Sequence, residues 1–326
     1  NFKKKAMKFN EETVTTAVDK NFSILMPVFY EMQTEYLASL NLIYEDLDAS
    51  LVGMVLTNKL YKKNLLNNGT DDSLGFNNFY KKDRFTVPSN EIKINQISNQ
   101  INIPRETVRR KRDKSIKDKI LILDKKNKSI SLNVDKIDKK ILKLQIDNLS
   151  KFLYKFTTYF VENNYINQKI TSEQIKSNIN SKFLVYLTKY LDFQILYFSM
   201  FKKILDIESI FIVMLCTLNI TSDLRKQNKI MDDKYILKNI KFMYDLPGLN
   251  VSSIAEITKI PRTTVIRKIN KLELDGFVTR DKNKRYYTAD LTKSVKGRQA
   301  MPYIDNNKKL ISKFFIDCFN YLIVKK

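Results

Sequence analysis

The sequence contains no histidine and only two cysteines, six glycines and six prolines among its 326 residues. The absence of histidine excludes imidazole-based acid/base catalysis and histidine-rich metal sites. Two cysteines, Cys216 and Cys318, cannot build a disulfide framework, and both stand in apolar stretches typical of a helical core. Six glycines leave little material for a phosphate-binding loop, and the sequence contains no nucleophile elbow and no cluster of metal ligands. We therefore expect a protein that is not an enzyme and that binds no metal or cofactor.

Long apolar runs are also missing. The most apolar stretch, SIFIVMLCTL at 209–218, is too short to span a bilayer, which takes about 20 apolar residues, and it predicts a buried core helix. The N-terminal sequence NFKKKAMKFNEE turns polar where a signal peptide would turn apolar. These features predict a cytoplasmic protein without a membrane partner.

Charge of one sign dominates what is present. The chain carries 58 Lys and Arg against 35 Asp and Glu, a formal net charge of +23, and an apolar fraction of 43% typical of a globular protein. Such a surplus indicates a polyanionic partner. Lys, Asn and Ile are also the residues that AT-rich coding DNA favours, so base composition accounts for part of the lysine excess. The location of the charge is therefore more informative than its total. The length allows two domains of ordinary size.

Three sequence patches occur twice, in the same order and about 160 positions apart. IPRETVRRK at 103–111 returns as IPRTTVIRK at 260–268. The other two pairs are DLDASLVGMVLT at 46–57 with DIESIFIVMLCT at 206–217, and SKFLYKFTTYFV at 150–161 with SKFFIDCFNYLI at 312–323. This order predicts a unit used twice, as domains at 1–163 and 164–326. Each domain is expected to contain apolar helices, a compact basic segment and a closing helix, at about 141–161 and 308–323.

The second copy of the basic segment, residues 249–292, has the clearer pattern. Ser252 or Ser253 can cap a short helix, and Ser253 with Glu256 has the spacing of a capping box. After a turn, Pro261 suits the start of a second helix. In this second helix, Val265, Ile269 and Leu272 form a stripe that is expected to be buried, and Gly276 ends the helix. Two strands are then expected at FVTRD and RYYTA, with DKNK as the turn between them.

Helix, turn, helix and basic hairpin in this order resemble the winged helix-turn-helix domain of bacterial transcription regulators. SIAEITKIPRTTVIRKINKLELDGFV looks most like MarR-type and IclR-type readers, and RDKNKRYYTADLTKSVKG is similar to the MarR wing, with Leu291, Thr292 and Gly297 following it. The resemblance covers about 50 residues of each copy, within winged helices at about 89–133 and 232–290. MarR-type readers are symmetric dimers, so the resemblance implies a mainly α fold with two small β-hairpin wings and the pseudo-two-fold arrangement of a fused MarR-type dimer.

The first copy departs from this pattern. Asn95 can cap its first helix, and Asn102 suits a left-handed turn before the second. The second helix of this copy either ends early or packs through Ile116 and Ile120. Three positions lack the residues that the second copy uses: Arg112 stands for Ile269, Ser115 for Leu272 and Lys119 for Gly276.

The candidate DNA contacts divide into two kinds. Arginines on the outer faces of the second helices can grip guanine in the major groove, and the two copies differ there at two positions. Ile266 suits a thymine methyl group, or else contacts a neighbouring helix of the protein. The candidate base readers are Arg105, Glu106 and Arg109 in the first copy and Arg262, Thr263, Ile266 and Arg267 in the second. Arg110 and Asn270 are further candidate DNA contacts. The candidate phosphate contacts are Thr107, Lys125, Lys126 and Lys128 in the first copy and Thr264, Lys282, Lys284 and Arg285 in the second.

The sequence therefore predicts a transcriptional regulator that binds double-stranded DNA sequence-specifically, through two recognition helices and their basic wings. A monomer acting as a pseudo-dimer would bind adjacent half-sites about one helical turn apart or a multiple of that, and a homodimer is the alternative. Two other functions stay open: a plasmid-type replication initiator with tandem winged helices, and a winged-helix scaffold for protein interactions. Aromatic-rich helical layers also leave open a small-molecule effector.

Overall fold

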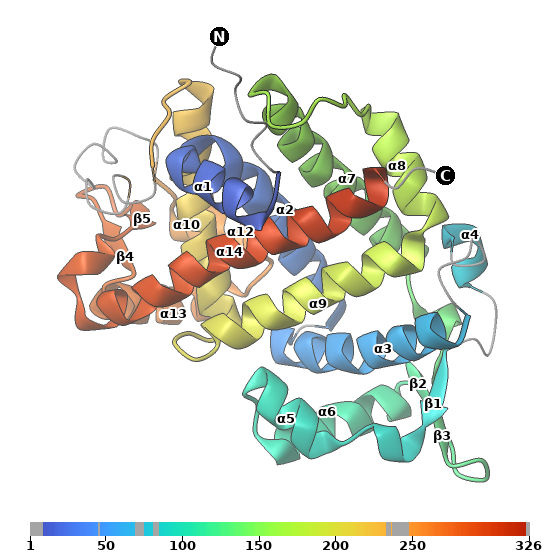
Figure 1. The fold of residues 1–326 in the computed structure, drawn as a ribbon. Coiled ribbons are helices and arrows are strands. Elements are labelled where there is room, and N and C mark those ends of the chain that lie inside the picture. The colour runs from blue at the N-terminus through green and yellow to red at the C-terminus, as the bar shows by residue number, and fades with distance from the viewer. Residues whose placement is uncertain are drawn as a thin grey trace. The chain divides into compact units, whose positions relative to one another are not determined.

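The structure is a computed structural model that describes residues 9–44, 46–68, 75–80, 85–232, 236 and 248–323. The chain is mainly helical with two small antiparallel sheets, as expected (Figure 1). Its contacts divide it into two compact units. Unit 1 comprises Asn1–Glu45, Lys155–Lys169 and Ile204–Ile316, and unit 2 comprises Asp46–Tyr154, Ile170–Lys203 and Asp317–Lys326.

Unit 1 is built around helix α10. This helix packs against α2 and also against α12, α13 and β5, so apolar side chains are buried around most of its circumference. By length and hydropathy it is the one helix of the described residues that could cross a membrane, yet most of its apolar window is buried inside the unit. The elements of unit 1 are α1 (Glu11–Lys20), α2 (Phe22–Tyr44), α10 (Ile207–Lys226), α12 (Val251–Thr258), α13 (Arg262–Leu274), β4 (Val278–Arg280), β5 (Tyr286–Thr288), η5 (Leu291–Lys293) and most of α14 (Val295–Ile323).

Unit 2 is built in the same way around α3. This helix packs along α9 and carries α5, α6 and β1 (Figure 1). Its elements are α3 (Leu47–Asn68), α4 (Phe76–Phe79), β1 (Thr86–Pro88), η2 (Ser89–Glu91), α5 (Ile94–Ile101), α6 (Arg105–Lys117), β2 (Leu121–Asp124), β3 (Ser129–Leu132), η3 (Val134–Lys136), most of α7 (Lys139–Glu162), α8 (Ser172–Ser181) and α9 (Phe183–Phe201).

The compact units are not the two consecutive domains expected at 1–163 and 164–326. Helix α2, from the first half of the sequence, packs on α10 of the second half, and α9, from the second half, packs on α3 of the first. Three of these helices, α2, α9 and α10, are too apolar to leave one side in water, so each requires cover on two sides. Part of that cover comes from the other half of the chain.

The two helix–hairpin segments follow the expected order of elements. We call α5, α6, β2 and β3 the first segment (94–132) and α12, α13, β4 and β5 the second segment (251–288). In the first, β3 pairs antiparallel with both β2 and β1. In the second, β5 pairs with β4, and Leu249 forms an isolated bridge with Tyr286. Part of the winged helix expected at 232–290, residues 233–235 and 237–247, lies outside the described residues.

The predicted helix caps were wrong in both segments. Helix α12 begins at Val251 after Asn250, whose side chain accepts a hydrogen bond from the Ser253 N–H at 2.9 Å, so neither Ser252 nor Ser253 is the cap. Helix α5 begins at Ile94 without a side-chain cap, so Asn95 lies inside the helix. Cap choice depends on the exact residue at which the chain turns, which several neighbouring polar residues leave open.

Helix α6 does not end early. It runs from Arg105 to Lys117 and has 13 residues, as does α13. Ile116 and Ile120 are half-buried, in agreement with the alternative that this helix packs through them. Lys119 then adopts a left-handed backbone with φ of 57°, as Gly276 does at 77°.

The closing helices begin earlier than expected. Helix α7 spans Lys139–Glu162 against an expected 141–161, and α14 begins at Val295 against an expected 308. Gly297 and Pro302 lie inside α14. Because glycine and proline usually indicate a turn or a helix end, the sequence does not predict helix at the first turns of α14. A Cβ atom at Gly297 would lie 2.3 Å from the carbonyl oxygen of Leu291, so the close approach of backbone at this point requires glycine.

Candidate nucleic-acid interface

In unit 1, α13 buries one face and exposes the other. The stripe of Val265, Ile269 and Leu272 is fully buried, as predicted, in a layer formed with α12, α10 and β4. Of the predicted contacts on this helix, Thr264 and Ile266 are half-buried. The residues fully open to solvent are Arg262, Thr263, Arg267 and Asn270.

In unit 2, α6 is placed in a similar way with a thinner apolar stripe. Val108 is the fully buried residue of this helix, and Ile97, Ile101 and Ile103 of the preceding turn and helix bury beside it. Thr107 is half-buried. The exposed candidates are Arg105, Glu106, Arg109 and Arg110.

The turn that sets the angle between the paired helices is the same in both segments. Asn102 has a left-handed backbone with φ of 51°, as predicted, and Lys259 occupies the same place with φ of 60°. Pro104 and Pro261 then precede the first residues of α6 and α13 with closely similar backbone angles. The structure therefore gives α5–α6 and α12–α13 one common local geometry.

An ion pair distinguishes the outer face of α6 from that of α13. The Arg109 guanidinium donates to Glu106 Oε2 from Nη2 at 2.7 Å and from Nε at 2.9 Å. Both side chains remain exposed, at 59% and 69%. The corresponding residues of α13 are Thr263 and Ile266, which cannot form such a pair. The first segment thus presents an acceptor and a donor side by side where the second presents neither charge.

In each segment, an aspartate side chain stabilises the hairpin turn by hydrogen bonds to the backbone of the turn. Asp281 Oδ1 accepts hydrogen bonds from the backbone N–H groups of Arg285 and Asn283, both at 2.9 Å, and these bonds lower the pKa of its carboxyl group. Asp124 accepts in the same way from Asn127 and Lys126, and its pKa is also lowered. This turn geometry leaves the basic side chains of the turns in solvent. They are Lys125, Lys126, Lys128, Lys282, Lys284 and Arg285.

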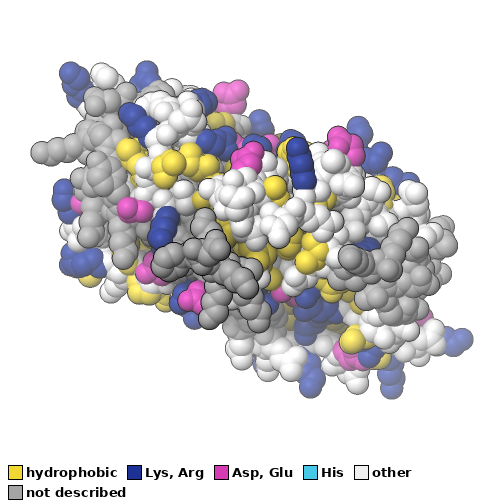
Figure 2. All heavy atoms as spheres, turned by 45° about the horizontal axis from the view of Figure 1, so that its top comes forward, with side chains coloured by type: hydrophobic (Ala, Val, Ile, Leu, Met, Phe, Trp, Pro, Cys, Tyr) yellow, Lys and Arg dark blue, Asp and Glu magenta, His cyan; other side chains and the backbone are white. Residues whose placement is uncertain are grey.

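Most of the outward cations have no carboxylate partner within the described part of the chain. The six turn cations make no ion pair there, nor do Arg105, Arg110, Arg262 and Arg267. On the face drawn in Figure 2, Lys and Arg side chains are scattered among acidic and uncharged ones rather than gathered in one patch. The location of the cations on particular helices and turns is therefore more informative than the net charge.

Two lysines anchor the candidate recognition helices, a role that the local sequence pattern does not predict. Lys111 of α6 pairs with Asp46 at the start of α3, and Lys268 of α13 pairs with Asp206 at 2.6 Å at the start of α10. Both lysine side chains are only 11% exposed. Lys268 also pairs with Glu208 at 3.0 Å. The signal was present in the sequence, because the lysines end the repeated nonapeptide and the aspartates begin another repeated patch.

The two aspartates of these pairs also cap their helices. Asp206 Oδ1 accepts from the Ser209 N–H at 3.0 Å, and Asp46 Oδ1 accepts from the Ala49 N–H at the same distance. Burial acts to raise the pKa of each carboxyl group, but the hydrogen bonds from the lysine and from the helix N–H outweigh it. The pKa of both aspartates therefore lies below its ordinary value.

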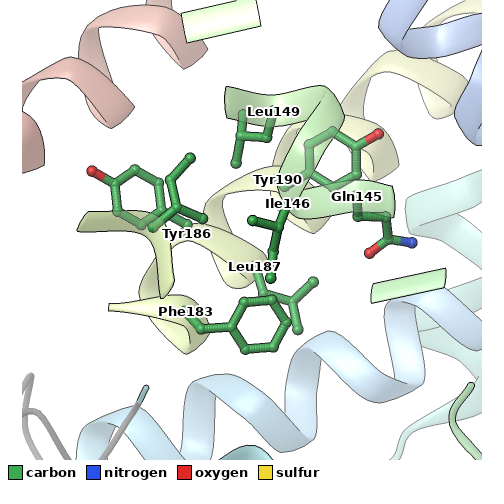
Figure 3. Close-up of a pocket in the computed structure, with 8 residues that line it drawn as sticks. Gln145, Ile146, Leu149, Phe183, Tyr186, Leu187 and Tyr190 are labelled. Atoms are coloured by element: carbon green, nitrogen blue, oxygen red, sulfur yellow. The ribbon is translucent and has the colours of Figure 1, made fainter. Parts of the chain in front are cut away.

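Other features of the described residues concern metal ligands, thiols and a cavity. No group of three acidic or cysteine side chains is placed there to hold a metal ion. Cys216 and Cys318 are buried as predicted, and burial raises the pKa of the Cys216 thiol to about 12. A small cavity in unit 2 is lined by α7, α8 and α9 (Figure 3). Its volume is about 10 Å³, which is about the room that one water molecule needs.

Comparisons of the chain with models of protein families, with curated proteins and with solved structures find no match. A functional assignment must therefore come from the chemistry of the residues themselves. In the two helix–hairpin segments, exposed cations and exposed polar side chains occur together on helices whose opposite faces are buried.

Proposed function

We propose that the protein is a sequence-specific transcriptional regulator that binds double-stranded DNA through two winged helix-turn-helix readers. In this proposal α6 and α13 are the recognition helices, whose N-terminal residues face base edges in the major groove. The β2–β3 and β4–β5 hairpins are the wings, whose turn cations contact phosphates.

One observation carries the proposal. In both segments the exposed guanidinium groups and the exposed turn lysines lie on two consecutive elements, α6 with the β2–β3 turn and α13 with the β4–β5 turn. The opposite faces of the same helices are buried, so the cations are presented by a rigid support rather than by a solvated tail. A charge run that served only solubility would not require this support.

Local agreement between the segments supports a tandem duplication. Both have a left-handed residue between their helices, a second after the recognition helix, and a lysine of that helix paired with the capping aspartate of α3 or α10. Both also add a short extended piece before the first helix, β1 or Leu249, which pairs with the second hairpin strand. A duplicated reader explains why one chain carries the same ion pair twice.

Selection of bound duplexes from a random pool tests the proposal. We expect a preferred sequence with two recognisable half-sites, and binding to that sequence that persists at about 0.2 M salt. Binding that is equal for all sequences and is lost at that salt concentration would contradict sequence-specific regulation. It would favour the interaction scaffold, in which the charge has no specific partner.

The form of the selected site also tests the second candidate function. A plasmid-type replication initiator would use the same two segments, and the presence of two readers in one chain supports it as well. Direct repeats in the selected sequence would favour initiation, whereas an inverted repeat would favour regulation.

A further inference from the structure

The two candidate recognition helices present different chemistry at their N-terminal turns. On α6, the carboxylate of Glu106 is exposed and receives two hydrogen bonds from Arg109 on a single oxygen, Oε2. No bond to the other oxygen, Oε1, is formed by the described residues. The first segment therefore presents an anionic acceptor, oriented by its pair with Arg109, on the surface that would face DNA.

A carboxylate on such a surface discriminates between DNA bases. Phosphate groups repel it, so it weakens binding to DNA of any sequence. In the major groove it can accept a hydrogen bond from the N4 amino group of cytosine. Arg109 uses Nε and Nη2 for the ion pair, which leaves donors on Nη1 for the O6 or N7 atom of a guanine. The pair as a whole is thus complementary to a C·G base pair or to neighbouring C and G.

The same positions of α13 carry no charge. Thr263 is exposed and Ile266 is half-buried, so the outer surface here offers a hydroxyl group and methyl groups. Apolar side chains of this kind contact the C5 methyl group of thymine. One turn further on, the exposed amide of Asn270 replaces Asp113, which α6 holds in an ion pair with Arg112 at 2.6 Å. Asn matches the N6 and N7 atoms of adenine.

We propose that the two segments read half-sites of different base content, so that the chain binds its target in one orientation. The half-site of the first segment contains a C·G pair at the position that Glu106 and Arg109 face. The half-site of the second segment contains a T·A pair at the position that Thr263 and Ile266 face. This inference rests on the proposed DNA-binding function and adds polarity to it, which two identical readers could not supply.

A purely structural role for Glu106 makes a different prediction. An acidic residue in the first turn of a helix interacts favourably with the helix dipole, and a pair three residues apart adds a little more. Loss of that role would lower the stability of the protein and would leave the preferred DNA sequence unchanged. Base preference is therefore the measurement that separates the two roles.

Sequence selection with wild-type protein and the Glu106→Gln variant provides the first test. Wild-type protein should select cytosine at one position of one half-site, and replacement of that cytosine by thymine should weaken its binding roughly 5- to 150-fold. The Glu106→Gln variant should lose the preference at that position alone. The matched Thr263→Ala variant in the second segment should keep the cytosine preference of wild-type protein.

A cleavage probe on one hairpin tests the orientation. The probe is a DNA-cleaving iron chelate attached to a cysteine introduced as Asn127→Cys in one protein and as Asn283→Cys in another, because both asparagines are exposed in the hairpin turns and neither is a candidate DNA contact. Native Cys216 and Cys318 are buried and their pKa is raised, so they should not be labelled. We expect cleavage at one end of the selected site for the first variant and at the opposite end for the second.

Three results overturn the inference while leaving DNA binding intact. They are the selection of two identical half-sites, an unchanged cytosine preference in Glu106→Gln, and equal cleavage at both ends by each labelled variant. A protein that selects no sequence at all overturns the proposed function instead, so the two failures are distinguishable.

Discussion

At the scale of single residues, the cations of this protein fall into two groups. Lys111 and Lys268 are nearly buried and fix the candidate recognition helices to the starts of α3 and α10. Arg262, Arg267 and Lys284 are exposed and, among the described residues, have no ion-pair partner. Substitutions of the first kind should act on stability, and substitutions of the second kind should act on binding.

We predict that Arg267→Ala weakens binding to the selected DNA by about 1–3 kcal/mol and relaxes the base preference, because a guanidinium on the outer face of α13 would read base edges. Arg262→Ala should behave in the same way. Lys284→Ala, in the hairpin turn, should weaken binding to all sequences alike. It should also reduce, by about one, the slope of the logarithm of the binding constant against the logarithm of the salt concentration. Titration of selected and scrambled duplexes at several salt concentrations measures both effects. An unchanged base preference in both arginine variants would show that α13 is not the recognition helix.

We predict that Lys268→Ala lowers the free energy of unfolding by about 1–3 kcal/mol, between the values for exposed and buried ion pairs. The substitution leaves Asp206 and Glu208 close together without their shared cation. Lys271→Ala is the matched control, because Lys271 is exposed on the same helix and should change stability by less than about 0.5 kcal/mol. Urea unfolding of the three proteins provides the comparison, and equal stability of both variants would contradict an anchoring role.

At the scale of elements, the two segments form the same backbone turn from different residues. A left-handed residue follows each candidate recognition helix, and it is Gly276 in unit 1 and Lys119 in unit 2. Glycine adopts this conformation without a steric penalty, whereas a residue with a Cβ atom is strained there. The structure thus retains the turn in the first segment even though its favoured residue is missing.

We predict opposite effects on stability for substitutions at positions 276 and 119. Gly276→Ala should destabilise the protein by more than about 1 kcal/mol, because the new Cβ atom would lie 2.4 Å from the Ser294 Cβ in addition to the backbone strain. Lys119→Gly should raise stability by up to about 1 kcal/mol, because it removes strain from the same turn. Thermal unfolding of the two variants tests the pair. A destabilised Lys119→Gly variant would mean that the lysine side chain contributes contacts that outweigh its backbone strain.

We also predict a loss of stability in acid that depends on the helix-capping aspartates. The pKa of Asp46 and Asp206 is lower in the folded protein than the ordinary value near 3.9, so the folded state binds fewer protons than the unfolded state. Their stabilising contribution is complete above that value and is lost as the pH falls through the folded pKa. Urea unfolding at pH 6, 4 and 3 should show this decline, and the decline should be smaller in Asp206→Asn. Identical pH dependence of variant and wild-type protein would contradict it.

At the scale of the whole molecule, the compact units are assembled from both halves of the sequence. In unit 2, Asn58 and Lys62 of α3 contact Asp192 of α9 at 2.8 and 2.6 Å. The rings of Phe79 and Phe183 meet there with centroids 5.2 Å apart. Unit 1 shows the reciprocal exchange, since Glu31 of α2 pairs with Arg225 of α10. Neither half of the sequence holds all the helices of either unit.

We predict that a fragment of residues 1–163 does not fold cooperatively on its own. It lacks α8 and α9, so the apolar face of α3 that packs on α9 would be exposed. The complementary fragment 164–326 lacks α2 and should fail for the corresponding reason. Circular dichroism and limited proteolysis of each fragment, alone and after mixing, measure this. Cooperative unfolding of an isolated fragment 1–163 would contradict the exchange of helices.

The sequence by itself determined the local parts: the order of helices and strands in the two segments, the buried stripe of Val265, Ile269 and Leu272, and the exposed basic residues. These follow from periodicity and turn residues close together in the chain. Only the tertiary structure decided that α2 and α9 exchange between the halves and that Lys111 and Lys268 are anchors. Those outcomes depend on contacts between residues far apart in the sequence, which local patterns do not specify.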